Sequence, residues 1–309
     1  MIDLESLYAS FVCQPGEQRQ LKIESPIEVF YGVSHDGYLR LAFLCKIQPP
    51  LLKSTKVLRI VEGPEGPKVY WLCFDLLNNE VKSAFFAFCK NMLEVAAGSS
   101  NESEALVKLK RRYLSWGILF KNASSSAIDK EKVQGLFGEL YFLKNFMMKK
   151  YGVERAISAW GGAESTSKDF AVNTDWYEVK TVGVLSPSVT ISSLTQLAST
   201  SPGRLAVIRV ERMPTEFSNG QSSISEILTT LLTSIGDVAM ETLLLEKVSS
   251  YGVSVADEAF ALKFDVKKLK QYRVEPGFPR ITPDDVPYPE IADVSYKIAL
   301  AAIERFSEE

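Results

Sequence analysis

The N-terminal third of the chain alternates short apolar runs with turn-forming residues. The apolar runs cover residues 27–33, 38–47 and 69–74, and turn-forming sequences at 34–37 and 63–67 separate them. Glycine, proline, asparagine and aspartate favour turns, and short apolar runs between such turns are typical of antiparallel strands. The pattern predicts a β-rich N-terminal domain over residues 1–104, with the polar stretch 98–104 as its expected end.

Two segments near this boundary change to helical spacing. Residues 81–96 and 105–121 each place large apolar side chains at intervals of three or four, as a helix with one buried face does. The second segment also has a basic outer face at residues 108–112. We expect one helix at the end of the N-terminal domain and one at the start of the next.

Residues 105–309 are expected to form a second domain with its core at 129–211. The predicted elements are a helix at 129–150, strands at 168–172, 176–184 and 204–211, a short helix at 191–199, two helices within 222–249, and a strand pair or the end of a strand within 260–273. A helix, a hairpin, a helix and a strand in this order give a mixed sheet that helices flank. The chain is therefore predicted to be α/β, or α+β when the N-terminal domain is included.

The candidate chemistry lies in the predicted hairpin. In a strand, residues two apart share a face, so Glu178 and Lys180 project a carboxylate and an ammonium into the same space. Asp169 begins the partner strand, and residues 173–175 favour a turn. A two-residue loop would place Asp169 opposite Glu178, and a four-residue loop would place it opposite Lys180. Either register brings these groups together, whereas a three-residue loop without a bulge would not.

Two carboxylates and one ammonium suit a hydrolytic site. Two ionised carboxylates a few ångströms apart repel each other, and a shared proton, a cation or a base such as Lys180 relieves the repulsion. A hard divalent cation with oxygen ligands fits this arrangement, so Mg²⁺ is expected, with Mn²⁺ as a substitute. Beside a scissile phosphate it would polarise an oxygen and lower the pKa of an attacking water. Lys180 would position that water or stabilise the developing charge.

Four motifs together resemble the PD-(D/E)XK nuclease superfamily, in particular an uncharacterised bacterial branch linked to restriction–modification loci. The motifs are G-x-x-G-E at 135–139, D-F at 169–170, E-V-K-T at 178–181 and S-S-L-x-Q-L at 192–197. The resemblance implies that Asp169 and Glu178 ligate the metal and that Lys180 is the catalytic lysine. Glu139 matches a helical acidic residue that supports or adds to the metal site. Gln196 matches a polar position on the following helix.

The resemblance also implies a function and partners. It points to a DNA endonuclease with a restriction-endonuclease-like fold, acting in restriction or anti-phage defence. The expected partners are DNA, a cognate methyltransferase or other defence proteins, and a second copy of the chain in a homodimer. The segments at 272–274 and 277–281 also resemble this branch, without a role to transfer. Two alternatives stay open: a nuclease-fold module that binds DNA without turnover, and an assembly subunit without nucleic-acid contact.

The same residues have ordinary structural interpretations. Glu178 and Lys180 could form an exposed ion pair on an edge strand. Glu139 could be a solvated helix residue, and Gln196 could bond to backbone or water. The two glycines before Glu139 favour a functional role, because glycine costs about 1 kcal/mol in a helix interior and is kept where a backbone or ligand comes close. Asp175 has the opposite strand parity to Glu178 and is left out of the site.

Composition and charge narrow the function classes. A chain of 309 residues with 46% hydrophobic and 24% charged residues is typical of a globular protein. The net charge of −3 gives no general attraction to a polyanion. Contacts with DNA phosphates are therefore expected from local basic clusters at residues 108–112 and 263–273.

Other readings of the sequence are set aside. The four cysteines are far apart and only one histidine is present, so buried, reduced thiols are expected in place of a zinc site. Consecutive Ser34, His35 and Asp36 indicate a hairpin turn, because the groups of a catalytic triad converge from separate segments. An acidic start and the absence of an apolar run near the ~20 residues that cross a bilayer predict a cytoplasmic protein without membrane contact.

Overall fold

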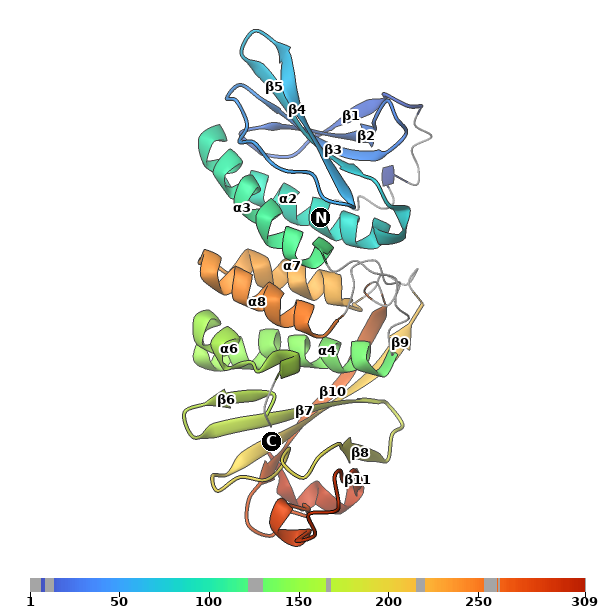
Figure 1. Cartoon of the computed structure of the whole chain (residues 1–309), viewed down its shortest axis with the longest axis vertical. Helices are drawn as coiled ribbons and strands as arrows, with labels where there is room; N and C mark the ends of the chain where they lie inside the picture. The colour runs from blue at the N-terminus through green and yellow to red at the C-terminus, as the bar shows by residue number, and fades with distance from the viewer. Residues whose placement is uncertain are drawn as a thin grey trace. The chain divides into compact units, whose positions relative to one another are not determined.

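The chain folds into two compact units, each with its own sheet. The structure is a computed structural model that describes residues 7–8, 14–121, 130–164, 168–214, 220–252, 260 and 262–308. The first unit consists of Met1–Ala127, Thr229–Ser249 and Ser254–Phe260, and the second consists of Ile128–Leu228, Ser250–Val253 and Ala261–Glu309. The chain therefore enters each unit more than once, as the colours of Figure 1 trace.

The first unit contains a five-stranded antiparallel sheet. The strand order is β1 (Gln18–Leu21), β2 (Glu28–Val33), β3 (Leu39–Cys45), β5 (Val69–Leu76) and β4 (Leu58–Gly66). β2, β3 and β5 confirm the predicted strands, whereas β1 and β4 were not predicted. The turn expected at 63–67 was placed too early, because β4 continues to Gly66 and the turn lies at Pro67 and Lys68. β4 is an edge strand, where a proline can be accommodated.

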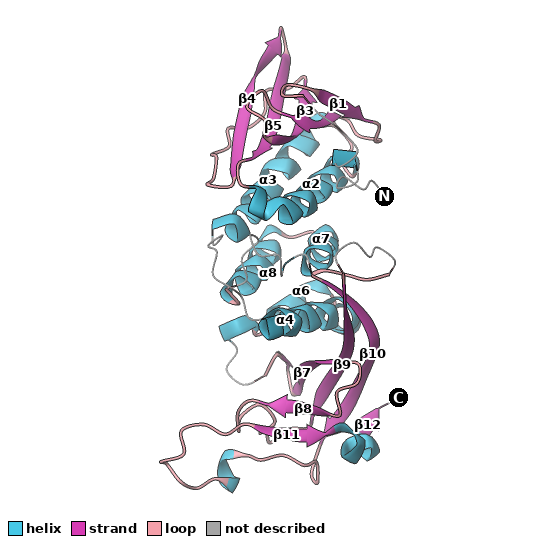
Figure 2. Ribbon diagram, turned by 90° about the vertical axis from the view of Figure 1, so that its right-hand side faces the viewer, coloured by secondary structure: helices cyan, strands magenta, loops and turns pink. Residues whose placement is uncertain are grey.

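Helices α2 (Lys82–Ala97) and α3 (Glu102–Lys121) lie along one face of this sheet (Figures 1 and 2). A 3₁₀ turn, Asn79–Val81, leads into α2. Phe88 of α2 contacts Phe74 of β5 at 5.4 Å and Trp116 of α3 at 5.9 Å between ring centroids, and all three are fully buried. Both predicted helices are confirmed. This packing includes α3 in the first unit, although the boundary expected after residue 104 would separate it from α2.

The second unit contains the predicted mixed sheet. The strand order is β12 (Ser307–Glu308), β10 (Lys263–Val274), β9 (Gly203–Met213), β7 (Asp175–Gly183) and β6 (Phe170–Val172). β7 and β9 run parallel, and the other neighbouring pairs are antiparallel. The predicted strands of the hairpin and the predicted strand at 204–211 are confirmed, and with them the mixed α/β fold class. Where a strand pair or the end of a strand was expected within 260–273, the described residues form the single strand β10.

Helices cover one face of this mixed sheet (Figure 2). The segment predicted as one helix over 129–150 consists of α4 (Lys130–Phe142), a π-helical turn (Leu143–Met147) and α5 (Met148–Tyr151), and residue 129 lies outside the described residues. A further helix, α6 (Val153–Ala159), and a 3₁₀ turn, Gly162–Glu164, were not predicted. Helices α7 (Ile224–Ser234) and α8 (Val238–Ser250) confirm the two expected within 222–249, and residues Thr229–Ser249 of this pair belong to the first unit. Within the described part of the chain, no helix combines the length and the apolar character needed to cross a bilayer.

The short helix expected at 191–199 was wrong. Strand β8 (Ser188–Ile191) pairs instead with β11 (Tyr296–Ala299) on the other side of the mixed sheet (Figure 2), and turns and bends follow it up to Leu197. Val189 and Ile191 are buried while Thr190 is exposed, which is the two-residue period of a strand. Two 3₁₀ segments, Pro283–Asp285 and Leu300–Phe306, flank β11 along the chain.

Candidate active site at the β6–β7 hairpin

The β6–β7 hairpin has a two-residue turn, which sets the register of the candidate residues. Asn173 and Thr174 form the turn, and Asn173 has a φ of 54° in the left-handed region that asparagine tolerates. Phe170 pairs with Tyr177, so the next position places Asp169 opposite Glu178. Of the two registers that the sequence left open, the structure has the first. Asp169 Oδ2 also accepts a hydrogen bond from the backbone N–H of Val179 at 2.7 Å.

Lys180 lies between two oxygen acceptors on the face that it shares with Glu178. Its Nζ is 2.9 Å from Glu178 Oε1, close enough for an ion pair although not aligned for a hydrogen bond. The same Nζ donates to Gln196 Oε1 at 3.2 Å, and the backbone N–H of Ser192 donates to that oxygen at 2.8 Å. Lys180 therefore contacts both of the predicted residues Glu178 and Gln196, although Gln196 lies on a loop and not on a helix.

Burial disfavours the charged forms of both carboxyl groups. Burial raises the pKa of Asp169, and the Val179 N–H and the Lys180 ammonium partly offset this rise. Glu178 is only 1% exposed, and burial, followed by the nearby Asp169 carboxylate, raises its pKa to about 8. Burial likewise lowers the pKa of Lys168 to about 8. The exposed ion pair considered from sequence is excluded for Glu178 because its side chain is buried.

Glu139 is held by two donors that the sequence did not single out. Its Oε2 accepts from the indole N–H of Trp160 at 2.7 Å and from the hydroxyl of Tyr251 at 2.5 Å, and these two rings stack at 5.9 Å. Burial, and then the carboxylate of Asp169, raise the pKa of Glu139 well above its usual value. Glu139 is thus a buried acid within electrostatic range of Asp169 and Glu178. A buried indole N–H needs an acceptor. This requirement was the one sequence signal that could have pointed to Trp160 as a partner of a buried acid.

The opposite face of β7 packs on α4, as strand parity requires. Tyr177 contacts Phe142 at 5.5 Å between ring centroids. A Cβ on Gly138 would lie 1.7 Å from Thr181 Oγ1, so glycine at this position allows α4 to approach the strand. A Cβ on Gly135 would meet nothing within 4 Å. Only the second glycine of the motif is therefore explained by close packing.

The donor set fits a divalent cation that retains water. Within the described ranges, no three histidine, cysteine, aspartate or glutamate side chains converge as a metal-binding group. Asp169 and Glu178 supply two carboxylates, one half-buried and one buried, and Glu178 Oε1 receives no hydrogen bond. Mg²⁺ is commonly held by one or two carboxylates, with waters and substrate phosphates as its other ligands. The two carboxylates of the hairpin are sufficient for that kind of site.

Other candidate sites are accounted for by structure. Ser34, His35 and Asp36 form the β2–β3 turn, in which the N–H of Gly37 donates to the carbonyl of Ser34 at 2.9 Å. Asp36 pairs with Arg59 at 2.6 Å. The interpretation of this segment as a turn is confirmed.

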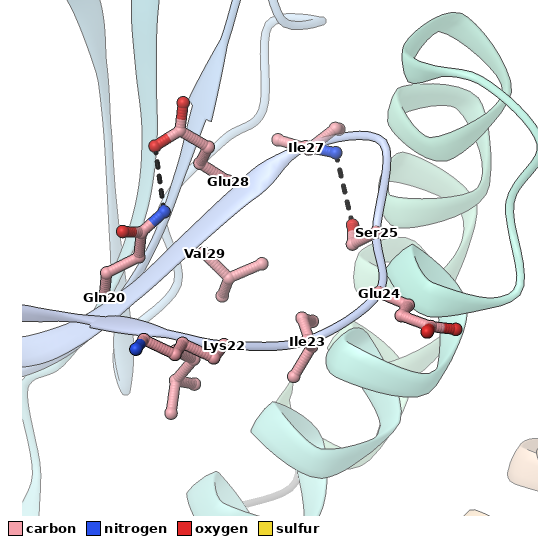
Figure 3. Close-up of a pocket in the computed structure, with 9 residues that line it drawn as sticks. Gln20, Lys22, Ile23, Glu24, Ser25, Ile27, Glu28 and Val29 are labelled. Carbon is pink, nitrogen blue, oxygen red and sulfur yellow. Dashed lines mark hydrogen bonds between the residues drawn. The ribbon is translucent and has the colours of Figure 1, made fainter.

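A surface hollow lies at the β1–β2 connection (Figure 3). Gln20 Nε2 donates to Glu28 Oε2 at 3.0 Å, and Ser25 Oγ accepts from the N–H of Ile27 at 3.2 Å. The hollow belongs to the first unit, whereas the hairpin belongs to the second. It is therefore a feature of the N-terminal sheet, separate from the candidate chemistry.

Several side chains of the two basic clusters are engaged in ion pairs. Arg111 and Arg112 both contact Glu241, at 3.0 and 3.1 Å. Lys267 contacts Asp265 at 2.6 Å, and Lys270 pairs with Glu304. Their use as phosphate contacts stays a prediction.

One family model matches the chain over residues 6–301, and its description is "Putative PD-(D/E)XK family member, (DUF4420)". No curated protein and no solved structure matches the chain. The matched range includes the hairpin, Glu139 on α4 and the loop that carries Gln196. The chain belongs to the DUF4420 family, which is described as part of the PD-(D/E)XK group.

Proposed function

We propose that this protein is a Mg²⁺-dependent DNA endonuclease that hydrolyses phosphodiester bonds. The observation that carries the proposal is the group of Asp169, Glu178 and Lys180 at one hairpin, with the Glu178 side chain buried, Asp169 half-buried and the ammonium 2.9 Å from Glu178. Buried carboxylates of like charge raise each other's pKa, and a divalent cation removes that penalty. Membership of the PD-(D/E)XK group agrees with this chemistry.

Each residue has a proposed task. Asp169 and Glu178 would hold the cation, which supplies charge neutralisation at the phosphate and a lowered pKa for an attacking water when it is bound. Lys180 orients that water or stabilises charge that develops on the phosphoryl oxygens. Gln196 accepts from Lys180 at 3.2 Å and thereby fixes the direction of the ammonium. Glu139 supports the site electrostatically, since one of its oxygens is already engaged by Trp160 and Tyr251.

The proposed role is restriction or anti-phage defence, which rests on the family resemblance alone. The proposed location is the cytoplasm. The proposed partners are DNA, a cognate methyltransferase or another defence protein, and a second copy of the chain. A nuclease-fold subunit that binds DNA without cutting it is the alternative. The two differ in whether a cleavage product forms.

The test is incubation of supercoiled plasmid and unmethylated phage DNA with the protein and Mg²⁺ or Mn²⁺. We expect nicked or linear DNA from the wild type. Lys180→Ala and Glu178→Ala should form no product while they keep the wild-type circular dichroism spectrum. Lys297→Met is the matched control, because Lys297 is an exposed cation on β11 and its loss should leave cleavage unchanged.

Three outcomes separate the possibilities. Cleavage that requires a divalent cation, Glu178 and Lys180 supports the endonuclease. Salt-sensitive DNA affinity without product, in the wild type and under all metal conditions, supports the binding subunit. If the wild type shows no DNA affinity and forms no product, both the endonuclease and the binding subunit are overturned.

A further inference from the structure

Four consecutive carbonyl groups in the loop after β8 accept hydrogen bonds from two cationic side chains. Lys168 Nζ donates to the carbonyl oxygens of Thr195, Gln196 and Ala198, at 2.7, 2.7 and 2.9 Å. Arg280 Nη1 donates to the carbonyl oxygen of Leu197 at 2.8 Å. An ammonium has three N–H donors, so Lys168 directs one of them at each of three carbonyls.

This loop lacks the regular structure that would satisfy its own carbonyls. The described residues 192–198 form neither helix nor strand. Backbone carbonyls that are partly buried need donors from elsewhere. Charge-assisted hydrogen bonds are stronger than neutral ones, so two cations can hold such a loop in one conformation.

Both cations are anchored in the second unit. Lys168 directly precedes Asp169, and its Nζ lies 4.3 Å from the centre of the Trp176 ring, which is 4% exposed. Arg280 follows a turn at Gly277, whose φ of 89° is in the left-handed region. Phe278 fixes that turn to the core, because it is 5% exposed and contacts Phe306 at 5.1 Å between ring centroids. The segment 277–281 therefore has a structural reason to carry an arginine.

We propose that Lys168 and Arg280 are positioning residues that clamp the loop and thereby set the direction of the Lys180 ammonium. Gln196 connects the clamped loop to Lys180. Its carbonyl is held by Lys168, and its side-chain oxygen accepts from Lys180 at 3.2 Å and from the Ser192 N–H at 2.8 Å. A shift of the loop moves Gln196 Oε1 and so turns Lys180 toward or away from Glu178. This inference rests on the proposed nuclease function for its effect on rate, but not for its effect on the loop.

A direct contact between Lys168 and a substrate phosphate is the competing role. A phosphate contact contributes to DNA affinity and to its salt dependence. A clamp contributes to geometry, and a misplacement of about 1 Å can slow an enzyme by about a hundredfold. The two roles therefore differ in whether turnover or affinity changes.

The experiment compares Lys168→Met and Arg280→Met with the wild type, and uses Lys297→Met as the control for loss of one exposed cation. Single-turnover cleavage of plasmid DNA, DNA affinity at several salt concentrations, and hydrogen exchange of the full-length protein are measured. The clamp predicts turnover slower by about tenfold to a hundredfold. It also predicts unchanged affinity and salt slope, and faster exchange in residues 192–198 only.

Two further variants connect the clamp to its target and control for misfolding. Lys168→Met combined with Gln196→Ala should cleave no more slowly than Gln196→Ala alone, because both act through Lys180. Lys168→Cys should be slow and should regain activity after alkylation with 2-bromoethylamine, which restores an ammonium at nearly the same distance. Wild-type protein treated in parallel controls for the native cysteines.

Three results would overturn the clamp. The first is unchanged hydrogen exchange in residues 192–198 of both methionine variants. The second is weaker DNA affinity with a smaller salt slope while turnover stays unchanged. The third is a turnover in the Lys168→Met, Gln196→Ala double variant that is slowed by the sum of the two single effects. If the wild type cuts no DNA, the proposed function fails, and the exchange measurement still decides whether the two cations hold the loop.

Discussion

Gly138 of α4 and Thr181 of β7 lie so close that a Cβ on the glycine would be 1.7 Å from Thr181 Oγ1 and 2.9 Å from Thr181 Cβ. This approach determines how the helix that carries Glu139 packs on the strand that carries Glu178. Gly138→Ala should therefore destabilise the second unit by about 1–3 kcal/mol, the usual range for overpacking. Urea unfolding followed by circular dichroism measures the change.

Gly135 provides the matched control for Gly138. It lies one turn earlier in the same helix, and a Cβ there meets nothing within 4 Å. Gly135→Ala should leave stability unchanged or raise it by up to about 1 kcal/mol, because alanine has the higher helix propensity. Equal effects of the two substitutions would show that the close approach is not what requires glycine.

The hairpin could be predicted from sequence because its determinants are local. Strand parity places Glu178 and Lys180 on one face, and Asn173 with Thr174 supplies the turn. The choice between a two-residue and a four-residue loop was left open, since both place Asp169 on the correct face. Packing of Phe170 against Phe142, at 5.5 Å between ring centroids, is part of what the sequence could not show.

The elements that sequence missed depend on distant partners. The segment after Ile191 was expected to be a helix, yet its carbonyls bond to Lys168 and Arg280, which lie about 30 and 80 residues away. Hydrogen bonds from such distant side chains can override the local helix propensity only once the unit has folded. Glu139 shows the same limit, because Tyr251 lies 112 residues further along the chain. Local patterns therefore found the acids and the lysine but not the groups that hold them.

Asp75 is the centre of a buried ion cluster on the N-terminal sheet. It is fully buried and accepts from Arg40 at 2.6 Å and from Arg59 at 2.9 Å. Asp75→Asn should destabilise the first unit by about 3–5 kcal/mol, because the substitution leaves the buried Arg40 guanidinium without its counter-charge. Thermal or urea unfolding of the full chain detects the loss.

Asp36 is the exposed comparison for Asp75. Asp36 pairs with Arg59 at 2.6 Å, but the Asp36 side chain is 60% exposed. Asp36→Asn should change stability by no more than about 1 kcal/mol, since surface ion pairs contribute little. If Asp36→Asn lowers the free energy of unfolding more than Asp75→Asn does, the buried Asp75 ion pairs are not the main source of stability.

Cys45, Cys73 and Cys89 should resist alkylation in the folded protein. All three are free and buried, and burial raises the pKa of Cys45 and of Cys73 to about 12 and that of Cys89 well above its usual value. Iodoacetamide reacts with the thiolate, so at pH 8 these groups should react only after unfolding in urea. Peptide mass spectrometry separates them from Cys13, which lies outside the described residues. Rapid labelling of all three without urea would contradict the buried positions.

Glu178→Gln should stabilise the metal-free protein while it removes function. The wild-type side chain buries a carboxyl group beside Asp169, and both burial and that neighbour disfavour its charge. A neutral amide of the same shape avoids this penalty, so the Tm in EDTA should rise. Mg²⁺ should raise the Tm of the wild type by mass action and leave that of the variant unchanged.

The exposed Glu211 is the control for loss of a carboxylate. Its side chain is 53% exposed on β9 and pairs with Lys267 at 3.1 Å. Glu211→Gln should change neither the Tm in EDTA nor the response to Mg²⁺, because a screened surface charge carries little energy. If Glu178→Gln instead lowers the Tm in EDTA, the Lys180 ammonium compensates the buried Glu178 carboxylate without a metal. The hairpin would then be an ion-paired structural element, as the non-enzymatic alternative requires.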